Sequence, residues 1–179
     1  MTKQGDIIVN HRTGQQMTFL KTGAETEGSL LQIDCYSPVT LLREPEHIHP
    51  FQENRFRIIS GELTFSVNGQ EKTASAGDSI SVPKNVPHRF WNSGKIEARY
   101  IQEFAPAMKI DQLFQTFFAL SRDSKLNERG IPNIFHASLI MLAHKNEIRL
   151  AKPSWTLQKL AFKTLAPFAL LFGFRSHYS

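Results

Sequence analysis

The spacing of apolar residues changes once along this 179-residue chain, near Pro106, and this change strongly constrains the fold. Before it, apolar and polar residues alternate in short runs, as Leu63, Phe65 and Val67 do with the residues between them. Alternation with a period of two is typical of β-strands that bury one face. After Pro106, apolar residues recur every three or four positions, which is typical of amphipathic helices. We therefore expect a mainly β fold followed by about three α-helices.

A tight β-hairpin is predicted at Asn68-Gly69, because these residues tolerate the positive φ angles that a two-residue hairpin turn requires. The turn would join strands at 62–67 and 70–74. Ile80 and Val82 alternate with two serines in the same way and indicate a further half-buried strand. Many short strands separated by turn residues predict an antiparallel sandwich or barrel.

The C-terminal part of the chain is expected to be helical. Apolar residues have helical spacing over 110–118 and 157–168, and the segment 134–143 is apolar almost all round, as in a helix packed on several sides. Ser154 is the predicted N-cap of the last helix, and the polar run 121–130 is a predicted loop. We predict a barrel domain at residues 1–108 and a helical extension at 109–179.

Composition indicates a cytoplasmic protein whose charge is divided unevenly. Cys35 is the only cysteine, so no intrachain disulfide can form, and the first residues contain no apolar export segment. Residues 1–108 carry 11 Lys and Arg against 12 Asp and Glu, whereas residues 109–179 carry 10 against 4. The basic excess of the chain therefore belongs to the predicted helical extension.

Three histidines form the strongest candidate site. His47 and His49 are two residues apart, so on a strand their side chains point to the same face. His88 lies thirty-nine residues after His49 and could complete one half of a metal shell. A single histidine is more often a hydrogen-bonded structural residue than a ligand, but three in this pattern favour a metal site.

The segments around these histidines resemble the paired motifs of the cupin superfamily. The first family motif has His-x-His, then Glu, then Gly, and this chain has His47, His49 and Gly61. The second motif matches at Gly77, Pro83, His88 and Asn92, with Asn85 where the family usually has Gly. The resemblance covers roughly residues 30–105. It implies an antiparallel jelly-roll barrel, also called a double-stranded β-helix, with a metal ion inside its mouth.

The chain departs from the family at the carboxylate ligand. Counting back from Gly61 places the family's Glu at Asn54, while Glu53 is one position away. Alternation groups Asn54 with Phe56 on the predicted inner face and Glu53 with two arginines on the outer face. A β-bulge after Pro50 would reverse this phase, so Asn54 and Glu53 both stay open as a fourth ligand.

Without a carboxylate ligand, the bound ion would keep its full positive charge. Such an ion attracts anionic ligands, so we expect a small, chelating, anionic molecule as the partner. The sequence does not distinguish iron, manganese, zinc and nickel. Three-histidine sites support oxygenase chemistry or Lewis-acid chemistry such as isomerisation. The alternative is a non-catalytic binder or sensor of small ligands that has lost a functional metal site.

Four further residues are candidates for the pocket around the ion. Phe90 should share the inward face of His88, and Phe56 points inward on the same phase as Asn54. Asn92 could hold a ligand histidine or close the barrel through hydrogen bonds, and Gln52 is a candidate for the rim.

The basic extension suggests several partners. The apolar run at 165–174 is too short to span a bilayer and is expected to form a packed helix. Flanking basic residues such as Lys159 and Lys163 could instead place this helix on an anionic lipid surface. The basic residues are scattered, which disfavours nucleic-acid binding. A neighbouring subunit is the third alternative, and the cupin resemblance implies a homodimer.

Overall fold

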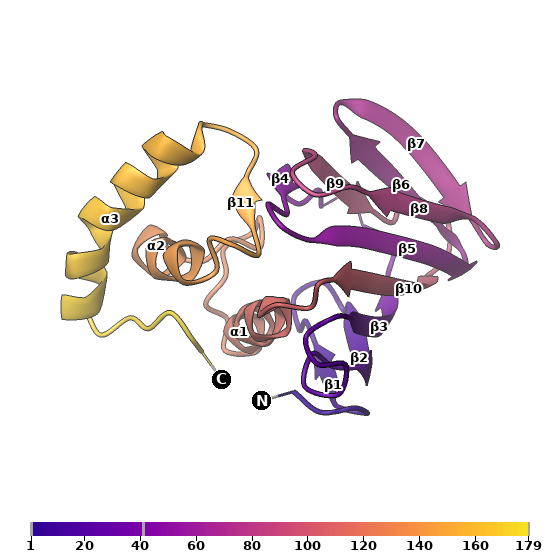
Figure 1. The fold of residues 1–179 in the computed structure, drawn as a ribbon, viewed down its shortest axis with the longest axis horizontal. Coiled ribbons are helices and arrows are strands. Elements are labelled where there is room, and N and C mark those ends of the chain that lie inside the picture. The colour runs from indigo at the N-terminus through magenta and orange to yellow at the C-terminus, as the bar shows by residue number, and fades with distance from the viewer. Residues whose placement is uncertain (1, 41, 179) are drawn as a thin grey trace.

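Two antiparallel sheets form the first part of the molecule, and three helices lie to one side of them (Figure 1). The computed structural model describes residues 2–40 and 42–178. The six-stranded sheet has the order β1-β2-β3-β10-β5-β8, and the five-stranded sheet has the order β11-β4-β9-β6-β7. The strands are β1 (Ile7–Val9), β2 (Gln16–Lys21), β3 (Leu31–Ser37), β4 (His47–Ile48), β5 (Glu53–Ser60), β6 (Glu62–Val67), β7 (Gln70–Ser75), β8 (Ser79–Val82), β9 (His88–Trp91), β10 (Ala98–Ala105) and β11 (Arg149–Leu150). The predicted mainly β jelly roll is confirmed.

The predicted hairpin is present between β6 and β7. Asn68 has a φ of 49° and Gly69 a φ of 78°, so both turn residues adopt the left-handed conformation that joins two strands tightly. Val67 pairs directly with Gln70, which fixes the register of the two strands. Leu63 and Phe65 consequently point into the core, as the alternation predicts.

Aromatic side chains fill the space between the two sheets. Phe56 of β5 contacts Phe65 of β6 and Phe90 of β9, with ring centroids 4.9 Å apart in both pairs. Tyr100 of β10 closes the cluster from the six-stranded sheet, 5.9 Å from Phe90. Each large aromatic side chain removes much apolar surface from water, so this cluster holds the two sheets together.

The helices are α1 (Ile110–Arg122), α2 (Ile134–Ala143) and α3 (Trp155–Leu171). In Figure 1, α2 lies between α3 and the rest of the molecule, so α3 is outermost. Asn133 caps α2 by accepting a hydrogen bond from the backbone N–H of Phe135. Ser154 occupies the predicted N-cap position of α3, but its side chain makes no capping hydrogen bond. None of the described helices has the length and hydropathy needed to cross a membrane.

The extension returns to the barrel through β11, a short strand between α2 and α3. Arg149 pairs with Ile48 and Leu150 with His47, so β11 extends the five-stranded sheet next to the first histidine strand. The backbone N–H of Ala151 continues this ladder by donating to the carbonyl of Glu46 at 2.9 Å. The extension is therefore joined to the barrel by backbone pairing as well as by the covalent connection after residue 108. That residue as the domain boundary stays a prediction.

Candidate metal centre

The three predicted histidines are buried and lie together at strands β4 and β9 of the five-stranded sheet. His47 in β4 pairs directly with His88 in β9, and their ring centroids are 4.5 Å apart. His49 follows β4, and its ring centroid is 5.2 Å from each of the other two. One ligand nitrogen from each ring lies within 4.8 Å of the others. In the part of the chain that the structure describes, no other group of three His, Cys, Asp or Glu is this compact.

Backbone carbonyls hold all three imidazoles in the same tautomer. Each Nδ1 lies within hydrogen-bonding distance of a carbonyl oxygen: His47 and Pro45 at 3.1 Å, His49 and Glu147 at 2.6 Å, His88 and Val86 at 2.9 Å. A carbonyl oxygen can only accept, so each Nδ1 must carry the hydrogen in these bonds. Each neutral ring then presents an Nε2 lone pair, the form in which imidazole binds a metal.

The surroundings of the rings fit a bound cation. His88 is buried, and its Nε2 has no hydrogen-bond partner among the described residues. A buried polar atom without a hydrogen-bond partner lowers the stability of the fold, so an ion or a ligand bound to this nitrogen would be favourable. The three rings are of the ligand type that binds zinc and similar ions, with nitrogen–metal bonds of about 2.0–2.1 Å.

Burial keeps the three rings uncharged at neutral pH. Desolvation, reinforced by the nearby histidines, lowers the pKa of His47 well below its usual value and the pKa of His49 to about 3. Desolvation also lowers the pKa of His88, although the Val86 carbonyl opposes the shift. Ligation therefore does not have to displace protons from these rings at neutral pH.

The structure turns Asn54 inward and Glu53 outward, in the phase that alternation predicts. Asn54 is only 1% exposed, and its Oδ1 accepts a hydrogen bond from Gln102 Nε2 at 3.1 Å. Glu53 instead binds Arg55 at 2.6 Å and accepts from the Ser81 hydroxyl at 2.5 Å. These bonds, with Arg55 contributing most, lower the pKa of Glu53 to about 2. Strand alternation thus separates this carboxylate from the histidines.

Asn54 borders the histidine site through one aromatic ring. It pairs across the sheet with Phe104 of β10, whose ring lies edge-on to His49 with centroids 5.2 Å apart. The Nδ2 of Asn54 is buried and has no partner among the described residues. This N–H group can donate a hydrogen bond, and an anionic ligand would supply an acceptor for it.

The other predicted pocket residues occupy two different environments. Phe56 and Phe90 belong to the aromatic cluster of the core. Asn92 donates from Nδ2 to the carbonyls of Ser37 and Ile96 at 2.7 and 2.9 Å, which matches the barrel-closing alternative. Gln52 is fully buried rather than at a rim, and its Nε2 donates to the carbonyls of Pro106 and Ala107, both at 3.0 Å. This amide connects the barrel to the start of the extension.

Two acidic residues just before His47 in the sequence were missed by the motif comparison. Glu44 is exposed as a residue, but desolvation of its carboxyl group raises the pKa of Glu44 to about 7. The charge of Glu46 acts on His88 and favours its protonated form. In the sequence these two residues appear as Glu44-Pro45-Glu46, directly before His47. This segment contains no ligand position of the family motif, so the motif comparison did not point to it.

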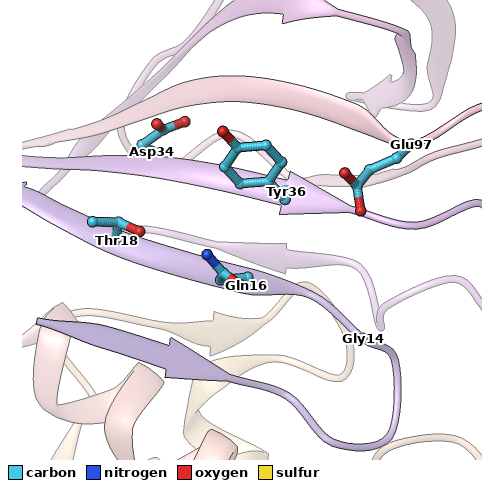
Figure 2. A pocket seen from close by; sticks show the side chains of 6 residues that line it. All are labelled: Gly14, Gln16, Thr18, Asp34, Tyr36 and Glu97. Atoms are coloured by element: carbon cyan, nitrogen blue, oxygen red, sulfur yellow. The ribbon is translucent and has the colours of Figure 1, made fainter.

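A separate hollow of about 300 Å³ lies on the outer face of the six-stranded sheet (Figure 2). Its side chains come largely from β2 and β3, and the figure shows Asp34 and Tyr36 side by side on one strand. Asp34 is already neutralised by Arg99 at 2.8 Å. The hollow contains no histidine and is distinct from the candidate metal centre. Its lining residues are Gly14, Gln16, Thr18, Asp34, Tyr36 and Glu97.

The lowered pKa values predict that the metal-free protein loses stability as the pH falls. The unfolded chain binds protons near pH 6.5, whereas the buried rings do so only at lower pH, so acid favours unfolding. Between about pH 6.5 and pH 4, His49 alone should cost about 1.4 kcal/mol of unfolding free energy per pH unit. Urea unfolding of chelator-treated protein across this range would measure the slope.

His49→Gln should flatten this slope, while His11→Gln, which changes an exposed histidine, should leave it as in the wild type. A wild-type unfolding free energy that stays constant from pH 6.5 to pH 4 would contradict the assigned neutral rings.

Known proteins resemble this chain over its barrel. A family model described as "Cupin domain" matches residues 40–102. The tetracenomycin polyketide synthase protein TcmJ of Streptomyces glaucescens is 33% identical over 103 residues, which cover 56% of this chain and 67% of that protein.

Two solved structures share the fold. An RmlC-like cupin from Shewanella frigidimarina is 22% identical, with a TM-score of 0.50 over 62% of this chain and 92% of that one. A predicted oxalate decarboxylase from Thermotoga maritima is 19% identical, with a TM-score of 0.51 over 59% of this chain and 99% of that one. The match to the family model, the 33% identical relative and the shared fold lead to one conclusion: this chain belongs to the cupin superfamily.

Proposed function

We propose that this protein binds a divalent metal ion through His47, His49 and His88 and uses it to bind a small anionic molecule. The observation that carries the proposal is the set of three Nδ1 hydrogen bonds to carbonyls, which leave three Nε2 atoms free inside the sheet. Imidazole donors favour ions such as iron, nickel or zinc over magnesium and calcium. The single cysteine, Cys35, is buried and free of any disulfide, in keeping with the proposed cytoplasmic location.

Charge supports an anionic ligand. The three rings are neutral and the inward residue at the family's carboxylate position is the amide Asn54, so the protein side chains leave the ion uncompensated. An ion with its full charge in a buried site binds anions strongly. The unpartnered Nδ2 of Asn54, separated from His49 by the Phe104 ring, is a further buried hydrogen-bond donor.

We further propose that the protein catalyses a reaction of the bound molecule. A divalent ion with open positions can polarise a carbonyl group or bring a substrate and oxygen together, which supports isomerase or oxygenase activity. The similarity to a polyketide synthase protein supports a polyketide-like ligand that carries carbonyl groups. Glu44, three residues before His47 in the chain, has a pKa raised to about 7 and could therefore exchange a proton at neutral pH.

Metal content tests the proposal directly. Protein purified without chelator should contain close to one ion per chain, and His47→Ala/His88→Ala should contain almost none, because one remaining imidazole cannot hold the ion. His11→Ala is the matched control and should keep the wild-type content. Elemental analysis of the three proteins gives the answer, and a metal-free wild type would overturn the proposal.

The extension should contribute to metal affinity, because the carbonyl that orients His49 belongs to Glu147. Ala151→Pro removes the N–H that bonds to Glu46 and weakens the pairing of β11 with β4. We expect the metal dissociation constant to rise roughly tenfold or more, the usual effect of losing a partner of a ligand histidine.

Competition with a chromophoric chelator would measure this affinity, with Ala151→Ser as a control that retains the N–H. Equal affinities for Ala151→Pro and wild type in folded protein would show that β11 does not position His49.

A further inference from the structure

The outer face of α3 exposes a row of large apolar side chains. Leu157, Leu160, Phe168 and Leu171 are 55%, 64%, 54% and 79% exposed. Their spacing by three, eight and three residues places them on one side of the helix. Thr164 lies on the same side, but its hydroxyl donates to the Leu160 carbonyl at 3.0 Å and so leaves no free donor there.

This face has no partner within the described chain. α3 packs against α2 through a different stripe, which contains the buried residues Gln158, Phe162 and Ala169. Figure 1 shows α3 at the edge of the molecule, with α2 between it and the sheets. A contiguous apolar surface of this kind usually marks a binding surface, whereas single exposed apolar residues do not.

The charges around the face all have the same sign. From Ile148 to Tyr178 the chain contains five Lys and Arg residues and no Asp or Glu. Lys159 and Lys163, one helical turn apart, form an exposed row beside the apolar face. The other three are Arg149, Lys152 and Arg175.

We propose that the outer face of α3 binds the surface of an anionic lipid bilayer. Leucine and phenylalanine side chains would enter the boundary between headgroups and acyl chains, while the lysines would contact lipid phosphates. A second copy of α3 is disfavoured as the occupant, because pairing two such faces would bring rows of lysines together without an acidic counterpart. Nucleic acid would leave the apolar row exposed to water.

The proposal does not depend on the metal site, although the two elements are connected. Residues 151–154 link α3 to β11, which pairs with the strand of His47. A bilayer bound by α3 would therefore hold the histidine site near the lipid surface.

Vesicle co-sedimentation tests this proposal with two lipid mixtures, phosphatidylcholine alone and phosphatidylcholine with phosphatidylglycerol. Wild-type protein should sediment with the mixed vesicles and do so less at high salt, which screens the lysines. Leu160→Gln/Phe168→Gln should lower the partition coefficient at least about tenfold, because two exposed apolar anchors are lost. Lys159→Gln/Lys163→Gln should lower it roughly 30-fold on the anionic vesicles alone.

Ile96→Gln is the matched control, since Ile96 is 63% exposed on the barrel and far from α3 in the chain. All variants should unfold at the wild-type temperature and keep the wild-type metal content, which separates this proposal from the proposed function. Equal sedimentation of wild type and Leu160→Gln/Phe168→Gln would overturn it. The proposal would also be overturned if the wild-type protein were a dimer that this double variant dissociates, because the apolar face would then bind a second copy of the chain.

Discussion

The hydrogen bonds from three imidazole Nδ1 atoms to backbone carbonyls are the interaction on which the site depends. They fix the tautomer of each ring and aim its free nitrogen without any dedicated polar side chain. Pro45 and Val86 lie two residues before the histidines that they orient, whereas Glu147 lies 98 residues after His49. Two of the three rings are therefore positioned locally, and the third is positioned only when the helical extension folds back onto the barrel.

The charge of the site depends on which side chains of β5 face the interior. β5 turns Asn54 into the barrel and sends Glu53 to the surface, where Arg55 neutralises it. The interior next to the histidines thus has an amide where a cupin motif would have a carboxylate. Burial keeps the three rings neutral as well. We therefore propose that an ion held by these histidines would keep its charge and attract an anion without the help of a cationic side chain.

Sequence reasoning succeeded where periodicity and spacing carry the information. The alternation around Leu63, the Asn68-Gly69 turn and the spacing of the histidines depend on neighbours in sequence, so they could be interpreted without a structure. β11 could not be predicted, because a strand of two residues has no period and exists only through its pairing with β4. The bonds of Gln52 to Pro106 and Ala107 were missed for the same reason, since they join segments that are far apart in the chain.

Nitrogen-15 NMR of the histidine rings tests the central claim most directly, because it reports which ring nitrogen carries hydrogen. In metal-free protein near pH 7, the account predicts that His47, His49 and His88 are neutral with hydrogen on Nδ1, and that added zinc shifts their Nε2 signals. Rings with hydrogen on Nε2, or Nε2 signals unchanged by zinc, would contradict it.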